Sequence, residues 1–571
     1  MKNKEVAEIF RQIAEILEIQ EENPFRIRAY LKAAQNVESL SRDVAEVARA
    51  DELEKIPGVG KDLAEKIKEI VKTGKLKFYE QLKDNIPEGL TILMSVPGLG
   101  PKTAKLLFDE LKIKNIEGLE KAARAHKISA LPGIKEKTEE NILRGIALIR
   151  KAKERMSLAQ AMATAAEFVQ ALRKLKEVKQ IEPAGSLRRR KETVRDIDIL
   201  VTSSQPEKIM DVFTGLGQVK EVKACGPTKS SVLTKNGIQV DLRCVRPKSF
   251  GAALLYFTGS KQHNIKLRQL AVKRGMKINE YGLFRGNKWL AGKTEEEMFG
   301  RFNLPYISPE LREDSGEIEA GLKGKLPKII DLKDIKGDLH VHSKWSDGAS
   351  TIENIARASM KMRYGYIAIC DHSQSIKIAG GLSIERLKKQ IDLIHKLNKK
   401  LKDFRVLAGT EVDIKSDGRL DYPDKILKEL DIVVAAIHTG FKQSQRQLTQ
   451  RIIAAMENRY VNVIAHPSGR LIGQREPYDL DMEKVLKKAR QTSTFIEINA
   501  FPERLDLTDI NCRRARELGV KMAISTDAHM LEQLRLMYLG VTVARRGWLE
   551  KKDVVNTLPL EKLLQVLRQK R

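Results

Sequence analysis

The stretch Gly185-Ser-Leu-Arg-Arg-Arg-Lys-Glu-Thr-Val-Arg-Asp-Ile-Asp-Ile-Leu200 decides the fold of the central part of this chain. Its second half has the period of a strand, so Asp196 and Asp198 are predicted on one face and Ile197 and Ile199 on the other. Its first half joins a Gly-Ser turn to three arginines, a composition that suits a bound triphosphate. The stretch therefore predicts an α+β domain with a phosphate-handling site.

A third carboxylate, Asp241, lies in the strand-like segment Ile238-Gln-Val-Asp-Leu-Arg243. Three carboxylates from neighbouring strands can hold two Mg²⁺ or Mn²⁺ ions about 3.5–4 Å apart, an arrangement that promotes displacement at a phosphate. Two aspartates in a strand are more often only a salt-bridged strand end. The Gly-Ser turn and the arginines upstream favour the catalytic interpretation.

Residues 1 to about 150 show helical periodicity interrupted by Pro-Gly turns. Ile56-Pro-Gly-Val-Gly60 and Val96-Pro-Gly-Leu-Gly100 each precede an amphipathic segment, as in helix-hairpin-helix motifs, whereas a third copy, Leu131-Pro-Gly-Ile134, has Lys135 instead of the second glycine. Free N–H groups at the start of the following helix can hold a DNA phosphate without reading sequence. The glycines predicted to form these DNA contacts are Gly58, Gly60, Gly98 and Gly100.

The whole chain is basic, with 104 Lys and Arg against 76 Asp and Glu, a net charge of +28. Such a charge attracts polyanions, and nucleic acid is the first candidate. Lysine enrichment in a heat-adapted organism is the alternative, but it normally raises glutamate in step. The chain lacks both a signal peptide and an apolar run of about 20 residues, so we expect no membrane partner and a cytoplasmic location.

The central stretch resembles the nucleotidyltransferase signature of the family X DNA polymerases, and Tyr256-Phe-Thr-Gly-Ser260 resembles the opening of their thumb. The resemblance covers residues 1 to about 315. It implies a monomer that fills short gaps during DNA repair, associated with the nucleoid when bound. Its implied partners are gapped or primer-template DNA and deoxynucleoside triphosphates.

The resemblance also implies roles for single residues. Asp196 and Asp198 would bind both metals, and Asp241 would activate the primer 3′-hydroxyl group. Arg195 stands where animal members carry glycine, which implies altered nucleotide affinity. The residues implied in nucleotide binding are Gly185, Ser186, Arg189, Tyr256, Phe257, Gly259, Asn264 and Arg268.

Three residues near the N-terminus match the family's lyase site. Arg26 and Tyr30 match residues that hold a 5′-phosphate, and Lys66 aligns with a Schiff-base lysine. A lysine on an exposed helix is ordinarily only solvated. Deoxyribose-phosphate lyase activity is therefore the weaker expectation, and 5′-phosphate binding is the stronger one.

Seven of the nine histidines follow residue 336, and six of these lie in short motifs. Imidazole is the commonest transition-metal ligand, so the concentration indicates a metal centre. Apolar runs alternate with amphipathic helices here, which predicts a parallel βα barrel with ligands at the ends of the strands. The predicted strand runs, besides the one that carries His340, are Tyr366–Ile369, Val406–Gly409, Ile432–Ile437, Val461–Ala465, Phe495–Ile498, Met522–Ser525 and Val541–Ala544.

This segment resembles the polymerase and histidinol phosphatase (PHP) family, which implies a trinuclear centre acting as a 3′-5′ exonuclease. Mixed imidazole and carboxylate ligands favour Mn²⁺ or Zn²⁺. Arg419, Arg470 and Arg475 follow ligand motifs and are candidate phosphate contacts. The nine implied ligands are His340, His342, Asp347, His372, Glu411, His438, His466, Asp527 and His529.

Two alternatives remain open at this stage. The barrel could be a 3′-phosphatase, another phosphomonoesterase or an abasic-site endonuclease, and the front end could be only a DNA-binding scaffold. The expected fold is multidomain α/β: helical helix-hairpin-helix domains, a mixed α+β nucleotidyltransferase palm and thumb, and a distorted (βα)7-type PHP barrel. The expected boundaries are 1–83 (lyase-like), 84–153 (fingers), 154–246 (palm), 247–315 (thumb), 316–334 (linker) and 335–571 (PHP).

Overall fold

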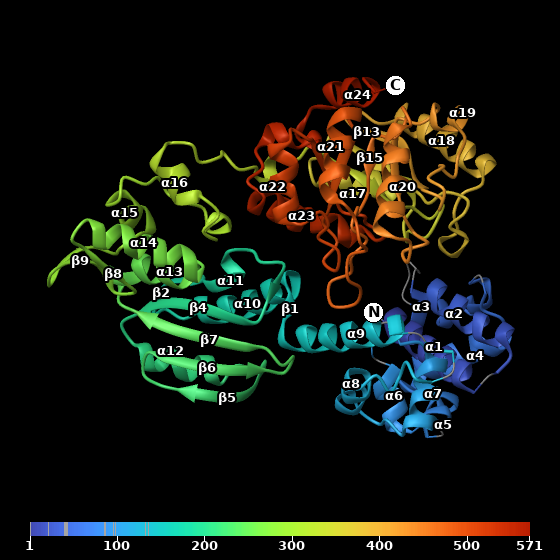
Figure 1. The fold of residues 1–571 in the computed structure, drawn as a ribbon, viewed down its shortest axis with the longest axis horizontal. Coiled ribbons are helices and arrows are strands. Elements are labelled where there is room, and N and C mark those ends of the chain that lie inside the picture. The colour runs from blue at the N-terminus through green and yellow to red at the C-terminus, as the bar shows by residue number, and fades with distance from the viewer. Residues whose placement is uncertain are drawn as a thin grey trace.

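The computed structural model describes residues 2–20, 22–38, 44–56, 58–84, 87–94, 96, 99–131, 133–134 and 136–570. Helical units, a central sheet and a barrel follow one another along the chain (Figure 1). One of the predicted DNA contacts, Gly98, lies outside the described residues. No helix of the described chain is long and apolar enough to cross a membrane.

The N-terminal part consists of two small helical units, each with its own apolar core. Phe10 and Tyr30 meet edge to face in the first core, with ring centroids 5.4 Å apart. The last helix, α9, leads from these units to the central sheet (Figure 1). The helices are α1 Lys2–Ile19, α2 Pro24–Glu38, α3 Val44–Arg49, α4 Lys61–Thr73, α5 Lys77–Asp84, α6 Glu88–Met94, α7 Pro101–Leu111, α8 Ile116–Arg124 and α9 Glu136–Glu154.

The palm is a five-stranded sheet in the order β2-β4-β7-β6-β5. Only β4 and β7 pair in parallel, and this pairing places two predicted metal-binding strands side by side. Apolar side chains on the helix-facing side of the sheet form the palm's part of the largest core. The elements are β1 Met156–Ser157, α10 Leu158–Arg173, β2 Val178–Pro183, α11 Gly185–Arg188, β3 Thr193–Val194, β4 Asp196–Ser203, α12 Pro206–Thr214, β5 Val219–Cys225, β6 Lys229–Thr234 and β7 Gln239–Val245.

The thumb follows directly and packs around a separate apolar core. Residues 316–334, the predicted linker, contain a short helix and a 3-10 turn. Ile330 in this connection is fully buried, and its N–H donates to the carbonyl of Leu549 at 2.9 Å. The elements are α13 Phe250–Thr258, α14 Lys261–Lys273, β8 Lys277–Asn279, β9 Gly282–Arg285, β10 Lys288–Ala291, α15 Glu295–Gly300, α16 Glu317–Leu322 and the turn Leu332–Asp334.

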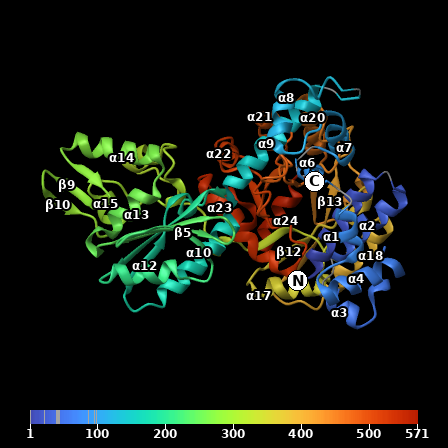
Figure 2. The same ribbon diagram turned by 90° about the horizontal axis from the view of Figure 1, so that it is seen from below.

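The C-terminal domain is a nearly closed barrel of seven parallel strands in sequence order. Every residue is buried in six of the seven strands, which explains their continuous apolar runs. Helices surround the barrel (Figure 2). The strands are β11 Gly337–Val341, β12 Tyr366–Ile369, β13 Arg405–Asp413, β14 Ile432–Ala436, β15 Val463–Ile464, β16 Phe495–Asn499 and β17 Met522–Ser525. The helices are α17 Ile352–Lys361, α18 Ile384–Asn398, α19 Asp424–Leu427, α20 Gln445–Glu457, α21 Met482–Thr492, α22 Asp509–Glu517, α23 Met537–Arg546 and α24 Leu560–Arg568.

The strand predicted at Val541–Ala544 is wrong, because these residues lie inside α23. Most side chains of α23 are buried, so it lacks a polar face. A short apolar run of this kind is equally compatible with a buried helix and a buried strand. Periodicity alone could not separate the two.

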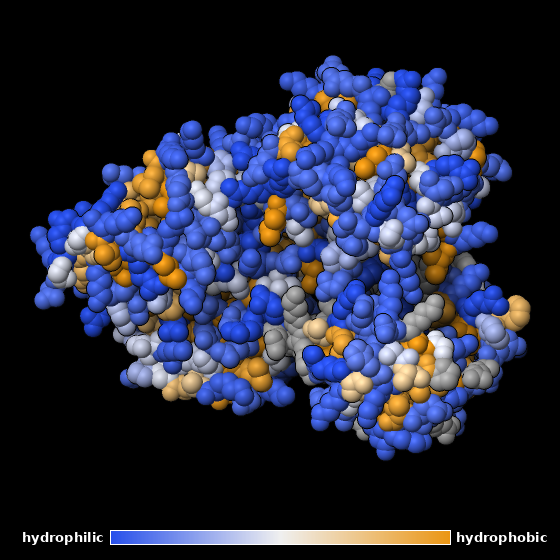
Figure 3. Space-filling model, viewed as in Figure 1, coloured by the Kyte–Doolittle hydropathy of each residue, from blue (hydrophilic) through white to orange (hydrophobic). Residues whose placement is uncertain are grey.

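The face of the molecule seen in Figure 3 is mostly hydrophilic, with scattered apolar patches. The barrel and palm meet through arginine side chains. Arg546 donates to the carbonyl of Arg189 at 2.7 Å, and Arg470 pairs with Glu192 at 2.8 Å. The palm turn that carries the predicted triphosphate site is thus in direct contact with the barrel.

Candidate active sites

The parallel pairing of β4 and β7 aligns Asp198 with Asp241, and Asp196 lies two residues earlier on the same face of β4. The turn that begins at Gly185, between β2 and β4, lies against the carboxylate of Asp198. Gly185 has a φ of +63°, and a Cβ atom there would lie 2.6 Å from Oδ2 of Asp198. Glycine is therefore required both by the left-handed backbone and by the close approach. The structure brings together Gly185 and the three predicted metal ligands.

Burial, followed by the charges of Asp196 and Asp241, raises the pKa of Asp198 to about 6. Ser231 and Gln239 donate hydrogen bonds to Oδ1 of Asp241, at 2.7 and 2.9 Å. A concentration of carboxylates with this mutual repulsion suits divalent cations, which remove the repulsion when bound. The residues present therefore fit a metal pair.

The charge repulsion at Asp198 predicts a pH-dependent effect on stability. In protein without divalent ions, Asp198→Asn should stabilise the palm by about 2–3 kcal/mol above pH 6. The folded pKa of about 6 exceeds the reference value of 3.8, so the wild-type penalty is complete above pH 6 and vanishes toward pH 4. Hydrogen exchange of β4, compared between the two proteins at pH 5 and 8, measures it. A pH-independent difference would contradict the electrostatic explanation.

The structure places Arg189 away from the three carboxylates. Its guanidinium donates to Glu313 at 2.9 Å and to the carbonyl of Thr258 at 2.8 Å. The neighbouring Arg188 forms two hydrogen bonds with Glu295. Both arginines hold the palm to the thumb in this structure, while Ser186 stays beside Gly185 at the start of α11.

The predicted nucleotide-binding residues of the thumb lie together at the junction of α13 and α14. The Asn264 amide donates to the carbonyl of Tyr256 at 2.7 Å, and Arg268 donates to the carbonyl of Asn264 at 3.2 Å. The rings of Tyr256 and Phe257 meet edge to face at 5.1 Å. A Cβ atom on Gly259 would lie 2.5 Å from Oδ1 of Asn264. These contacts fix the corner that the resemblance assigns to nucleotide binding.

The predicted 5′-phosphate residues gather around the ring of Phe78. Tyr30 stacks on it at 6.4 Å, and the side-chain cations of Arg26 and Lys66 lie 5.4 and 5.3 Å from its centre. Lys66 also forms an ion pair with Asp62. The structure therefore brings the three residues into one cluster.

The hairpin glycines occupy the turns that the sequence predicts. Gly58 has a φ of +79°, and Gly60 and Gly100 are the N-caps of α4 and α7 without a side-chain capping bond. The first N–H groups of α4 are thus open to an anion, and so are the N–H groups that follow Pro101, the first residue of α7, which has no N–H.

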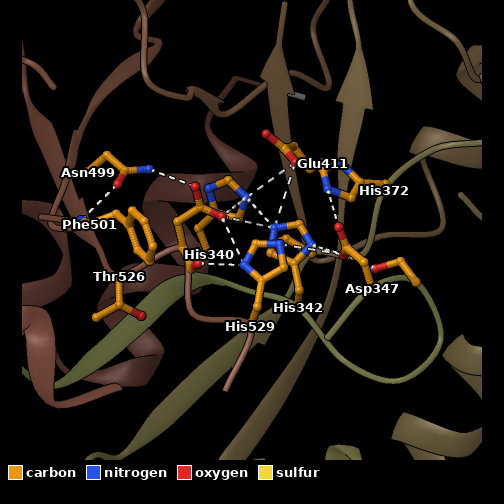
Figure 4. A network of polar contacts seen from close by, with 12 residues as sticks. His340, His342, Asp347, His372, Glu411, Asn499, Phe501, Thr526 and His529 are labelled. Atoms are coloured by element: carbon orange, nitrogen blue, oxygen red, sulfur yellow. Dashed lines mark hydrogen bonds and ion pairs between the residues drawn. The ribbon is translucent and has the colours of Figure 1, made fainter. Parts of the chain in front are cut away.

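The nine predicted ligands of the barrel converge at the carboxyl ends of its strands. Figure 4 shows six of them together: His340, His342, Asp347, His372, Glu411 and His529. Their potential ligand atoms form three groups within the described residues, each within 4.8 Å. The groups share His342 and His372, so three ions would lie in one connected centre. The groups are His342, Asp347, His372 and His529; His340, His342 and Asp527; and His372, Glu411 and His438.

The ninth residue, His466, lies beside the third group, with its Nε2 atom 2.9 Å from Oε1 of Glu411. Nδ1 of His342 and Nδ1 of His466 are buried without a hydrogen-bond partner. Burial, followed by the charges of His529 and His372, lowers the pKa of His342 to about 4. A transition metal requires a neutral imidazole with an unused nitrogen atom, and His342 and His466, whose pKa burial also lowers, meet this requirement. Together with the clustered carboxylates they form a donor set that fits metal ions.

A layer of polar residues holds the ligands from behind. Glu497, in the middle of β16, accepts from Nδ1 of His340 at 2.8 Å and from the N–H of His466 at 2.7 Å. Asp413 contacts Nδ1 of His438 at 3.2 Å. Such partners fix the orientation of ligating imidazoles. Glu497 was not predicted from the sequence, although a carboxylate inside the apolar run Phe495-Ile-Glu-Ile-Asn499 indicates a buried polar role.

Glu497→Gln should lower exonuclease activity and metal affinity about 10–100-fold, because the amide keeps the shape but loses the charge that orients His340. Metal content by mass spectrometry and 3′-end degradation measure the effect. Glu457→Gln, at the exposed end of α20, is the matched control. Full metal content and activity in Glu497→Gln would show that this contact is dispensable.

The arginines near the centre differ from the expectation. Arg504, which the sequence analysis did not single out, lies with Nε 3.6 Å from Oδ2 of Asp527. Arg470 binds the carbonyls of Arg504 and Leu505 and points to the palm, whereas Arg419 is exposed and pairs with Asp417. Arg504 had no motif signal because its loop is brought to the centre only by the barrel's closure.

Arg475, the remaining candidate, donates to the carbonyl of Gly469 at 2.8 Å, and its guanidinium lies 4.6 Å from the centre of the Phe441 ring. Burial lowers its pKa, and the nearby charge of Arg504 lowers it further. Arg475 and Arg504 therefore share one electropositive region beside the ligands.

Known families match four parts of the chain. The matching models are described as helix-hairpin-helix domain (residues 1–76), SAM-like helix-hairpin-helix tandem (90–147), DNA polymerase beta thumb (253–313) and PHP domain (338–500).

Relatives match the chain in whole and in part. DNA polymerase/3′-5′ exonuclease PolX of Bacillus subtilis (strain 168) is 40% identical over 565 residues, which cover 98% of each chain. A probable phosphatase of Thermoanaerobacter sp. (strain X514) is 33% identical over 246 residues, 41% of this chain and 95% of the relative. DNA polymerase lambda of Rattus norvegicus is 26% identical over 351 residues, 54% of this chain and 56% of the relative. Because the first similarity spans both candidate sites, the chain belongs to the family X DNA polymerases with a C-terminal PHP domain, which combine a polymerase with a 3′-5′ exonuclease.

Proposed function

We propose that the palm adds deoxynucleotides to a primer 3′ end in short gaps, with Asp196, Asp198 and Asp241 holding two Mg²⁺ or Mn²⁺ ions. The ions supply charge neutralisation at the transferred phosphate when bound. Asp241 would accept the proton of the primer hydroxyl group. Gly185 and Ser186 present backbone and hydroxyl donors to the triphosphate beside these carboxylates.

The proposed substrate is gapped or primer-template DNA. The open N–H groups after Gly60 in α4 and after Pro101 in α7 would each hold a backbone phosphate, and the net charge of +28 would attract the polyanion. The cluster around Phe78 would hold the 5′-phosphate of a gap through Arg26 and Tyr30. Lys66 is the candidate Schiff-base residue of a lyase reaction there. We expect a monomer in the cytoplasm, bound to nucleoid DNA.

For the barrel we propose a trinuclear Mn²⁺ or Zn²⁺ centre that hydrolyses the terminal phosphodiester at a DNA 3′ end. The ions supply an activated hydroxide when bound. Asp347, Glu411 and Asp527 provide three negative charges against three divalent ions, which leaves the site attractive to a phosphodiester. Arg504 and Arg475 would hold the non-bridging phosphate oxygens.

The observation that carries this proposal is the sharing of His342 and His372 among three ligand groups, together with the pairing of Asp198 and Asp241 in the same chain. A gapped duplex with a 5′-labelled primer tests it. Primer extension with nucleotides and shortening without them are the expected results. Failure of both with Mg²⁺ or Mn²⁺ would overturn the proposal.

A second candidate function for the barrel is phosphomonoester hydrolysis, because its probable-phosphatase relative matches over 95% of its length. The two functions are distinguished by the chemistry of the DNA 3′ end that the enzyme acts on. The exonuclease should release mononucleotides from a 3′-hydroxyl end, whereas a phosphatase should release only phosphate from a 3′-phosphate end. Incision of an internal abasic site would instead support an endonuclease.

A further inference from the structure

A cavity of about 260 Å³ lies between the palm and the barrel, outside both metal sites. Its palm wall is formed by Arg155 and residues 190–193, which join the Gly185–Arg189 turn to the strand that carries Asp196. Its barrel wall is formed by residues 508–510, Val543 and Arg546. The cavity therefore begins directly behind the turn that we assign to the triphosphate.

The cavity wall carries four cationic side chains and two carboxylates. Both carboxylates already form ion pairs, Glu192 with Arg470 outside the wall at 2.8 Å and Asp509 with Arg546 of the wall at 2.6 Å. Arg155, Arg190 and Lys191 are the wall cations that neither carboxylate pairs with.

None of the three other cations forms a close ion pair with a carboxylate of the wall. Arg155 donates only to the hydroxyl and carbonyl oxygens of Thr193, which are neutral. Lys191 forms a long ion pair, at 3.8 Å, with Glu313, which also pairs with Arg189 at 2.9 Å. Arg190 forms no ion pair with any described residue. The cavity thus combines positive charge with unused donor groups.

Arg190 is the least compensated of these cations. Burial lowers its pKa, and its backbone has a φ of +58°, a conformation that costs a non-glycine residue free energy. The charge of Glu310 favours this guanidinium, but no carboxylate of the described residues pairs with it within 4 Å, so a bound anion would offset part of the cost of its burial. Arginine also matches phosphate oxygens with paired donors.

We propose that this cavity binds a small, multiply charged phosphate anion, and pyrophosphate in particular. Its volume is below that of typical sites for drug-sized ligands, so it suits an inorganic anion rather than a whole nucleotide. Nucleotide addition releases pyrophosphate from the triphosphate at the Gly185–Ser186 turn, one short segment away. The source of the anion rests on the proposed polymerase function, but the binding site does not.

Isothermal titration of the full chain with sodium pyrophosphate, without added divalent ion, DNA or nucleotide, tests the proposal. The double variant Arg190→Gln/Lys191→Gln should lose affinity about tenfold or more at one site. Lys220→Gln, an exposed lysine on β5, is the matched control and should bind as wild type. Pyrophosphate that binds to metal ions retained in the protein should contribute equally in wild type, the double variant and Lys220→Gln.

A second variant leaves the palm loop unchanged, so that a weaker affinity cannot be explained by misfolding of that loop. Ile510→Glu adds a negative charge at the cavity from an exposed barrel position and should also weaken binding about tenfold. Unchanged pyrophosphate affinity in both variants, or equal affinity of wild type for sulfate and pyrophosphate, would overturn the proposal. If primer extension fails while this binding persists, only the polymerase proposal falls.

Discussion

Removing His342 should abolish degradation of a 3′ end while leaving synthesis intact. His342→Ala is expected to lower exonuclease activity by about 100-fold or more, because its imidazole belongs to two of the three ligand groups. Loss of a partner that only orients a ligand already costs about 10–100-fold. A 5′-labelled single strand incubated with Mn²⁺ measures the loss.

The matched control is His395→Ala, an exposed histidine of α18 outside the ligand groups. It should degrade DNA at the wild-type rate. Retained degradation in purified His342→Ala, with primer extension also normal, would show that the histidine centre is not the nuclease.

The second large effect is expected at the palm. Asp198→Asn should lower nucleotide incorporation about 100–1,000-fold, because it removes one of the three carboxylates that would hold the ions that stabilise charge at the transferred phosphate. The Asp198 side chain lies against Gly185, and Asp198 is aligned with Asp241 on the neighbouring strand. Single-nucleotide gap filling with Mg²⁺ measures the rate.

Asp211→Asn, an exposed aspartate on α12 of the same domain, is the control and should retain incorporation. The exonuclease of Asp198→Asn should also be unchanged, since its ligands come only from the barrel. Normal gap filling by Asp198→Asn would show that the palm carboxylates do not catalyse synthesis.

Local sequence patterns were sufficient to predict where site residues lie when the side chains are close in sequence or follow a strand. The spacing of Asp196 and Asp198 predicted one shared face, and the histidine motifs after apolar runs predicted convergence at the strand ends. These predictions depend on the strand period and on the geometry of parallel barrels, which hold in any sequence.

The remaining differences arise from contacts between distant segments. Glu497 lies 157 positions from His340 in the sequence, and Arg504 reaches Asp527 only through the folded loop. The engagement of Arg189 by Glu313 depends on how thumb and palm meet. Sequence periodicity does not predict such contacts, because they depend on how the domains pack against one another.

The most direct test of two separate active sites in one chain uses a single gapped duplex with a 5′-labelled primer and three proteins. Wild type should lengthen the primer with nucleotides and shorten it without them. His342→Ala should only lengthen it, and Asp198→Asn should only shorten it. Loss of both activities in either correctly folded variant, or of neither, would contradict this account.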